Sequence, residues 1–214
     1  MKTLNIPYIE GLETMPRTEL ENALKTEGAH DAVDNAPWAE FPYKPRVTFD
    51  IAASESHLFV QFHVEGLGLK AEFGNTNEPV WQDSCVEVFI ADPDGNGYRN
   101  FETNCIGTLL SAHQKGRGVD VTPISQTDAE KVIRYTSLPS ETFSEKEGEH
   151  RWSLIVGIPF ELIGYKNRPD SVRANLYKCA DGSRWPHYLS WAPIHTPQPD
   201  FHRPEFFGTL LLQQ

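Results

Sequence analysis

Hydrophobic and polar residues alternate with a period of two along residues 81–90, which predicts a β-strand with two different sides. Val86, Val88 and Ile90 fall on one side and suit a protein core because they are β-branched. The other side combines an aromatic ring with carboxylates, in the order Trp81, Asp83, Cys85, Glu87 and Phe89. A core does not accept unpaired carboxylates, so this side is predicted to face solvent or a ligand.

The turn-forming residues 91–98 (ADPDGNGY) follow this strand, and residues 101–110 (FETNCIGTLL) form a second extended run. The pair therefore predicts a hairpin that reverses around Gly95. This reversal brings Glu87 opposite the neighbourhood of Glu102 and Asn104. Like charges directly across a ladder destabilise it, so the position of Glu87 near Glu102 predicts a cation, a shared proton or a donor-rich ligand.

The rest of the chain adds further short strands and little helix. Strand patterns recur at residues 46–51, 58–64, 132–138, 151–158, 171–182, 187–194 and 205–213. Residues 1–17 are expected to wrap the surface, 66–78 and 115–131 to form loops, and 141–150 to form a charged tip. Thr18 and Glu21 predict a capping box for one short N-terminal helix that ends near Gly28.

About nine or ten short strands predict an all-β fold, an antiparallel β-sandwich of jelly-roll or immunoglobulin-like type. We expect one domain over residues 1–214, with its core between about residues 38 and 212. The three cysteines, Cys85, Cys105 and Cys179, lack CxxC spacing and are expected to be buried thiols rather than a disulfide framework or a zinc site.

The net charge of −11 and the pI near 5.1 disfavour nucleic acid and anionic membranes as partners, because both require a basic surface. Neutral or cationic partners fit better. The N-terminal residues MKTLNIPYIEG contain no apolar run of signal-peptide length, and no stretch is long enough to span a membrane. As written, the chain is expected to stay in the cytoplasm; a chain trimmed of its leader would look the same and be extracellular or periplasmic.

Several segments together resemble the family 9 carbohydrate-binding modules. These are PVWQDSCVEVFI, FETNCIG, VRANLYK, SWAPI and the ending that contains Pro204, Phe207 and Gly208. The resemblance spans about residues 38–212, and its most specific part is the W-x-D-S-x-V-E-x-F block. It implies a β-sandwich that binds the reducing-end sugar of a glycan between two aromatic rings, with glutamate, asparagine and arginine side chains bonding the hydroxyls.

Carried onto this chain, the resemblance implies that Trp81 is the first ring, Glu87 the glutamate and Asn104 the asparagine. The family arginine falls at Glu102, so an acceptor replaces a cationic donor, and the sugar specificity stays open. The second ring falls at Phe201, with Gln198 at a neighbouring polar position.

Trp185, beside Gly182 in a predicted hairpin tip, is the alternative second ring. A pyranose has apolar faces and a belt of hydroxyls, which suits aromatic rings edged by carboxylates and amides.

These residues favour non-catalytic binding of an oligosaccharide or polysaccharide such as xylan or cellulose, with a glycoside hydrolase as a candidate partner and no required cofactor. The alternative is a glycoside hydrolase that uses Glu87 and Glu102, because carboxylates roughly 5 Å apart suit a retaining mechanism. A haem or redox sandwich is disfavoured, since Met1 and Met15 are the only methionines available as axial ligands.

The turn at Asp92, Asp94 and Asn96 repeats the opening spacing of a calcium-binding loop, D-x-D-x-N-G. The twelfth position is Thr103 rather than glutamate, and no helices are predicted on either side. A metal-free Asx turn is the favoured interpretation. Structural calcium stays open, because the resembling family includes calcium-binding members.

Overall fold

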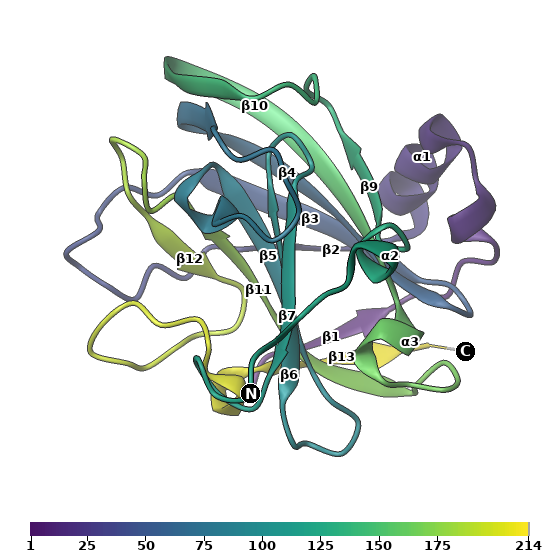
Figure 1. The fold of residues 1–214 in the computed structure, drawn as a ribbon. Coiled ribbons are helices and arrows are strands. Elements are labelled where there is room, and N and C mark those ends of the chain that lie inside the picture. Colours follow the sequence, from purple (N-terminus) through teal and green to yellow (C-terminus); the bar gives the residue numbers. More distant parts are fainter. Residues whose placement is uncertain (214) are drawn as a thin grey trace.

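The computed structural model describes residues 1–213 and shows two β-sheets packed face to face, with short helices at their margins (Figure 1). The all-β sandwich predicted from the sequence is confirmed. The larger sheet has the order β1-β13-β11-β5-β6-β7-β8, with β12 also paired to β11, and the smaller sheet has the order β2-β3-β4-β10-β9. Every pairing is antiparallel except that of β1 with β13.

The strands of the larger sheet are β1 (Thr3–Ile6), β5 (Cys85–Ala91), β6 (Tyr98–Asn104), β7 (Leu109–Gln114), β8 (Thr122–Pro123), β11 (Ser171–Cys179), β12 (Tyr188–Ser190) and β13 (Gly208–Leu212). Those of the smaller sheet are β2 (Ala29–Ala32), β3 (Arg46–Ala53), β4 (His57–Ala71), β9 (Ile133–Thr136) and β10 (Phe143–Pro159). The helices are α1 (Arg17–Glu27), α2 (Gln126–Ala129) and α3 (Phe160–Ile163), with 3-10 turns η1 (Leu12–Thr14), η2 (Val80–Gln82) and η3 (Pro204–Phe206).

The main core lies between the two sheets. Val86, Val88 and Ile90 of β5 belong to it, as the alternation predicted, and they share it with residues of β4 and β10 such as Phe62 and Leu154. Two smaller apolar clusters cover the outer faces: one lies under α1 on the smaller sheet, and the other is an aromatic cluster on the larger sheet. The opposite side of β5 therefore faces away from the main core, on the outer face of the larger sheet.

The central hairpin β5–β6 has the predicted turn and register. Gly95 has a φ of +73°, a left-handed conformation that glycine adopts without strain. Glu87 lies directly opposite Glu102, and Cys85 opposite Asn104. The second strand ends at Asn104, however, and residues 105–108 turn into β7, so the predicted run 101–110 belongs to two strands.

Several sequence-based expectations are corrected. The N-terminal segment does not merely wrap the surface, because β1 pairs with β13 and Ile6, Ile9 and Leu12 are buried. The first part of the predicted loop 66–78 is strand, and most of the predicted tip 141–150 belongs to β10; they pair with each other through register shifts. Residues 144–149 of β10 are mostly exposed, so backbone pairing maintains this part of the strand without a buried face to impose alternation. At the end of β4, Leu69 and Ala71 belong to the main core, but Gly66 and Gly68 interrupt the apolar pattern before them.

The N-terminal helix is confirmed, but its predicted capping box is wrong. The helix begins at Arg17, with Pro16 at the N-cap and no side-chain cap, so Thr18 already lies inside the first turn. Within residues 1–213, no helix combines the length and the apolar character needed to cross a membrane.

Candidate functional site

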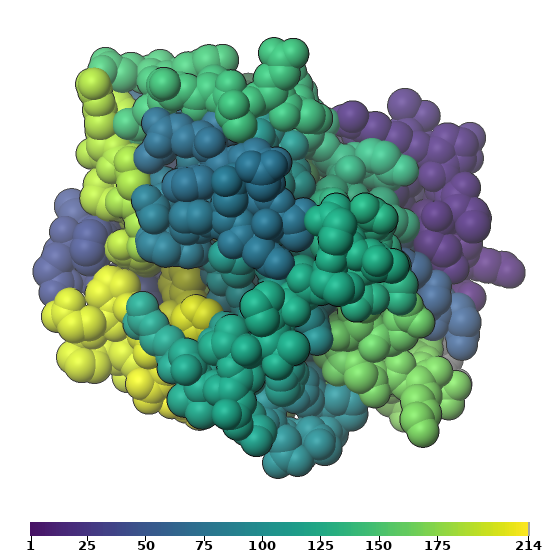
Figure 2. All heavy atoms as spheres, in the orientation of Figure 1, coloured from purple at the N-terminus to yellow at the C-terminus, as the bar shows by residue number. Residues whose placement is uncertain are grey.

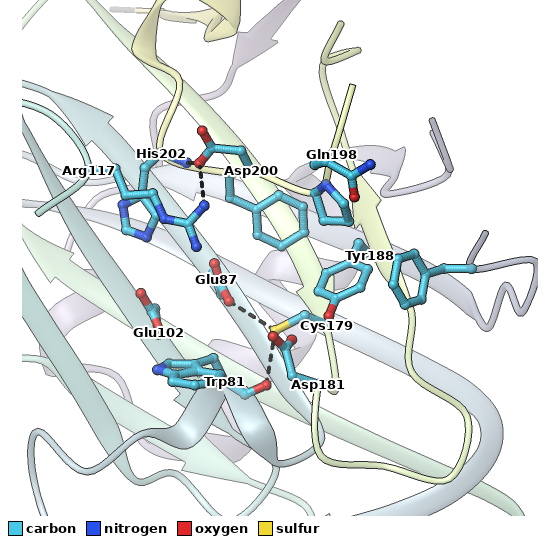
Figure 3. A pocket seen from close by; sticks show the side chains of 13 residues that line it. Trp81, Glu87, Glu102, Arg117, Cys179, Asp181, Tyr188, Gln198, Asp200 and His202 are labelled. Atoms are coloured by element: carbon cyan, nitrogen blue, oxygen red, sulfur yellow. Dashed lines mark hydrogen bonds and ion pairs between the residues drawn. The ribbon is translucent and has the colours of Figure 1, made fainter. Parts of the chain in front are cut away.

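A cavity of about 500 Å³ opens on the outer face of the larger sheet, over the β5–β6 hairpin (Figure 3). Five of the six predicted binding residues line it: Trp81, Glu87, Glu102, Gln198 and Phe201. Its size lies within the range of small-molecule sites in proteins. In Figure 3 the two glutamates lie between Trp81 and the segment that ends at His202.

Glu87 and Glu102 form the floor of the cavity and are almost completely buried, with 3% and 4% of their surface exposed. The thiol of Cys179 donates to Oε1 of Glu87 over 3.0 Å, and Nδ2 of Asn100 donates to Oε1 of Glu102 over 2.8 Å. Oε2 of Glu102 has no hydrogen-bond partner among the described residues. The floor therefore contains one buried acceptor that no described residue satisfies.

Burial raises the pKa of Glu102 to about 7. It raises the pKa of Glu87 well above the usual value, and the neighbouring Cys179 and Glu102 raise it further. Asp181 lies at the rim, where part of its surface is exposed. The surrounding protein atoms still exclude water from its carboxyl group, and this desolvation raises its pKa to about 6. The raised pKa values of both glutamates favour their protonated forms, which relieves the like-charge contact that the sequence predicted.

Trp81 forms an aromatic wall of the cavity and is 38% exposed. It lies in η2 rather than in β5, so it reaches this face through a turn and not by strand parity, which corrects the sequence argument. Its backbone carbonyl accepts a hydrogen bond from the amide of Asp181 over 3.1 Å and contacts the thiol of Cys179. These bonds fix η2 to the loop that follows β11.

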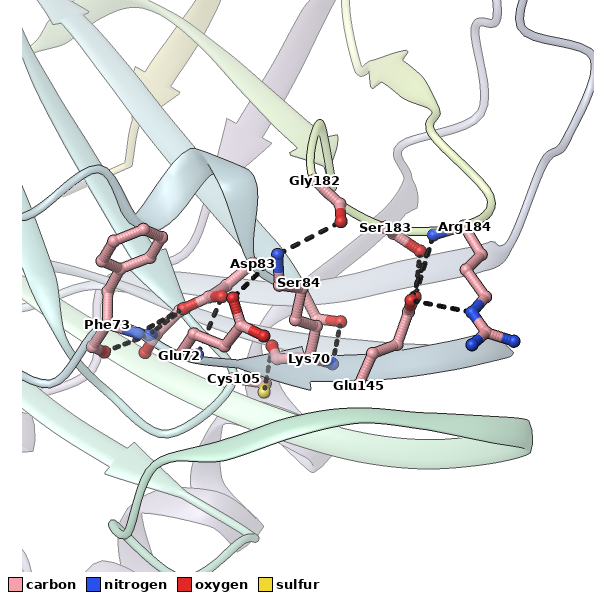
Figure 4. Close-up of polar contacts among 11 residues, drawn as sticks. Lys70, Glu72, Phe73, Asp83, Ser84, Cys105, Glu145, Gly182, Ser183 and Arg184 are labelled. Carbon is pink, nitrogen blue, oxygen red and sulfur yellow. Dashed lines mark hydrogen bonds and ion pairs between the residues drawn. The ribbon is translucent and has the colours of Figure 1, made fainter.

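Asp83, directly after η2, ties the same turn to the end of β4 (Figure 4). Its carboxylate accepts from the backbone amides of Glu72 and Phe73 over 2.9 and 3.1 Å. The same carboxylate accepts from Nδ2 of Asn104 over 2.9 Å. The side chain of Asp83 is fully buried. Asp83 therefore fixes the turn that carries Trp81, and it does not itself line the cavity.

Asn104 belongs to this support and is not a lining residue of the cavity. Its Nδ2 also donates to the carbonyl of Phe73 over 2.8 Å, and its Oδ1 accepts from the amide of Thr108 over 2.9 Å. The strand parity that placed Asn104 on the face of Glu102 is right, but the chain between β4 and η2 covers it. The side-chain amide of Asn104 is thus used in hydrogen bonds to Phe73, Asp83 and Thr108, and neither its nitrogen nor its oxygen faces a ligand in the cavity.

Phe201 contributes to the opposite wall but is 8% exposed. Its ring stacks on Tyr177 at a centroid distance of 4.2 Å and an interplanar angle of 9°, and the hydroxyl of Tyr177 donates to its carbonyl. Most of the ring is therefore used in packing. Trp185, the alternative second ring, lies outside the cavity, where its indole covers Gly68 of β4.

Other residues of the cavity carried no sequence signal, because they come from separate loops and from the start of the short strand β12. Tyr188 and Phe41 add aromatic surface and meet edge to face at 4.7 Å. Arg117 forms an ion pair with Asp200 at 3.4 Å, and Figure 2 shows the teal and yellow segments that carry them on the same face. His202 also lines the cavity, and burial lowers its pKa to about 4, so it is neutral at pH 7.

The candidate calcium residues form a hydrogen-bonded turn. Both oxygens of Asp94 accept from Asn96, through its backbone amide at 3.0 Å and its Nδ2 at 2.9 Å. Asp92 is paired with His113 at 2.6 Å. Since these carboxylates accept hydrogen bonds from nitrogen donors, the arrangement fits the Asx turn.

The three cysteines are free and buried, as expected, and Cys85 faces Cys179 across the β5–β11 ladder rather than Cys105. Ligand atoms of Cys85, Glu87 and Cys179 lie within 4.8 Å of one another, the only such metal-ligand group among residues 1–213. Burial raises the pKa of the Cys85 thiol to about 12 and that of Cys179 well above its usual value. Both thiols are therefore protonated, and Cys179 acts as a donor to Glu87.

A β-sandwich with an aromatic-walled, carboxyl-floored cavity on an outer sheet face defines a binding module. The family model "Carbohydrate-binding family 9" matches residues 19–212. The chain belongs to carbohydrate-binding family 9, as its sequence motifs indicated.

Solved structures agree with this assignment. A proposed carbohydrate-binding protein from Bacteroides uniformis ATCC 8492 is 31% identical, with a TM-score of 0.92 and coverage of 99% of each chain. A family 9 module from Caldicellulosiruptor kristjanssonii in complex with glucose is 11% identical, with a TM-score of 0.62 and coverage of 99% of this chain and 96% of that chain.

A structure of a family 9 module from the same organism in complex with cellotriose is 10% identical, with a TM-score of 0.59 and coverage of 99% and 94%. The likeness to these modules concerns the fold. Comparison with curated protein sequences finds no match.

Proposed function

We propose that this protein binds the terminal sugar unit of an oligosaccharide or polysaccharide in the cavity over the β5–β6 hairpin, without cleaving it. The observation that carries the proposal is the exposed face of Trp81 beside a buried carboxyl floor with an unpartnered acceptor. The indole suits the apolar face of a pyranose, and the carboxyl groups suit its hydroxyls. Binding of glucose and cellotriose by modules of similar fold supports this choice of ligand.

Tyr188 and Phe41 complete the aromatic surface in this proposal, while Phe201 serves mainly as packing. Gln198 lies at the rim, where its amide can both donate to and accept from hydroxyls. The sugar unit thus rests against Trp81 and directs hydroxyls to the glutamate floor.

Hydrolysis by Glu87 and Glu102 is the alternative, and the electrostatics of the pair disfavour it. A retaining enzyme needs one ionised carboxylate as nucleophile and one protonated acid, on either side of the bond that breaks. Here both glutamates occupy the same rung of one ladder, and burial raises both pKa values. We therefore assign chemical change of the glycan to a separate glycoside hydrolase.

Replacement of Trp81 by alanine tests the proposal. We expect isothermal titration with glucose, cellotriose and xylo-oligosaccharides to detect binding by the wild type and none by Trp81→Ala. The melting temperature should shift by only a few degrees, because a 38%-exposed side chain contributes little core packing, about 1 kcal/mol or less.

Trp185→Ala is the matched control, since this tryptophan lies outside the cavity and its loss should leave sugar affinity unchanged. Equal affinity of wild type and Trp81→Ala would contradict the proposed site. The appearance of new reducing ends during incubation with the oligosaccharides would favour the hydrolase instead.

A further inference from the structure

The cavity carries an excess of negative groups over positive ones. Four carboxyl groups line it, and Arg117 is its one permanent cation. Arg117 is already paired with Asp200 at 3.4 Å, and its side chain is 64% exposed at the rim. Among residues 1–213, the remaining three carboxyl groups, those of Glu87, Glu102 and Asp181, form no salt bridge, although the positive charge of Lys178 acts on Glu87 and Asp181 from behind the cavity lining.

The floor of the cavity contains a buried acceptor with no partner. Oε2 of Glu102 is fully enclosed and makes no hydrogen bond to any described residue, although Glu102 is only 4% exposed. An unpartnered buried carboxyl oxygen is costly, and its cost is removed by a ligand that brings both donors and positive charge. A neutral hydroxyl supplies one donor, whereas a primary ammonium supplies three donors and the charge.

The spacing of the carboxyl groups suits an organic cation better than a metal ion. Among residues 1–213, no set of three ligand atoms from Glu87, Glu102 and Asp181 lies within 4.8 Å. Calcium draws its oxygen ligands to about 2.3–2.6 Å, which requires a tighter cluster. The group that does meet this distance includes Cys85, which is fully buried and does not line the cavity.

We infer that the cavity takes a sugar unit that carries a free amine, with the ammonium group against Glu102 and Glu87 and the ring against Trp81. The inference rests on the proposed sugar-binding function and narrows it to a substrate class. An N-acetylated sugar loses the charge and most of the donors. A uronic acid brings a further carboxylate into a cavity that four carboxyl groups already line.

Isothermal titration at pH 7 with glucosamine, glucose, N-acetylglucosamine and glucuronate tests the inference. We expect glucosamine to bind at least about tenfold more tightly than glucose and N-acetylglucosamine, because it forms a charge-assisted pair with a buried carboxylate. Glucuronate should bind most weakly. Methylammonium, titrated in parallel, should bind far more weakly than glucosamine because it has no ring for Trp81.

Glu102→Gln keeps the size of the side chain and removes its charge, so it should lower the affinity for glucosamine by a much larger factor than the affinity for glucose and thereby reduce the preference. Glu130→Gln, which removes an exposed carboxylate distant from the cavity lining, is the charge-matched control and should keep the preference.

Measurable binding of glucose with no advantage for glucosamine would overturn the amino-sugar inference and leave the proposed function intact. Methylammonium binding as tight as that of glucosamine would overturn it as well, because the site would then recognise charge alone. Absence of binding to every sugar, cellotriose and xylo-oligosaccharides included, would overturn both.

Discussion

The ionisation state of Glu102 affects both the cavity and the stability of the fold. Burial raises its pKa from 4.5 in the ordinary case to about 7. Between these two values the folded state binds more protons than the unfolded state. The free energy of unfolding therefore falls as pH rises through this window, and the contribution is complete only below about pH 4.5.

The first prediction concerns this pH dependence. In wild type, ionisation of Glu102 should lower the free energy of unfolding between pH 5 and pH 8 by at most about 3 kcal/mol. In Glu102→Gln the side chain does not ionise, so its free energy of unfolding lacks this pH-dependent contribution. The melting temperature of the variant, relative to wild type, should therefore rise by several degrees from pH 5 to pH 8.

Thermal unfolding followed by circular dichroism at both pH values measures this difference, with Glu130→Gln as the exposed control. If the melting temperatures of wild type and Glu102→Gln change with pH in parallel, Glu102 ionises at an ordinary pKa and the cavity floor is accessible to water.

At the scale of elements, the site depends on how η2 is fixed between β4 and β5. The strand pattern alone predicted that Trp81 and Glu87 share a side, and the structure achieves this through a turn. Asp83 provides the link, because its carboxylate satisfies two backbone amides and one side-chain amide in a buried position. A carboxylate that the alternation placed on the ligand side thus has a supporting role.

The second prediction follows from this network. Asp83→Ala should lower the free energy of unfolding by about 2–5 kcal/mol, because two partly buried backbone amides and the buried side-chain amide of Asn104 lose their acceptor. It should also weaken sugar binding, since η2 no longer holds the indole of Trp81 in place. Urea unfolding and isothermal titration measure the two effects.

Asp34→Ala, at an exposed aspartate, is the matched control and should be close to neutral. Full stability of Asp83→Ala would mean that water replaces the carboxylate and that the link is dispensable.

At the scale of the whole molecule, the N-terminal segment is part of the sandwich. β1 extends the larger sheet by pairing in parallel with β13, and Ile6 enters the main core. The sequence alternates there over only four residues, Thr3–Ile6, with Leu4 and Ile6 on the more buried side, and so short a run was not recognised as a strand.

The third prediction tests this placement. Ile6→Ala should lower the free energy of unfolding by about 2–4 kcal/mol, as expected for truncation of a fully buried side chain that leaves a cavity. Asn5→Ala, one residue away on the exposed side, should change it little. Urea denaturation distinguishes the two, and equal effects would place residues 1–6 outside the folded sandwich.

Strands with one buried face were predictable from the sequence, because burial imposes a period of two on their side chains. Val47, Phe49 and Ile51 of β3 and the valines of β5 illustrate this. The first part of β10 was missed because its side chains are mostly exposed, and the end of β4 was missed because Gly66 and Gly68 interrupt its apolar pattern, although Leu69 and Ala71 are buried. The opposition of Glu87 and Glu102 was predictable because hairpin register follows from a short turn.

The sequence by itself determined the sandwich, the family motifs and the carboxyl pair at the centre of one sheet face. Only the tertiary structure decided that Asn104 supports η2, that Phe201 packs against Tyr177 and that Asp181, Tyr188 and Arg117 join the cavity. The reason is physical: alternation reports which side of a strand is buried, whereas a cavity is formed by loops whose contacts span the whole chain and leave no local period.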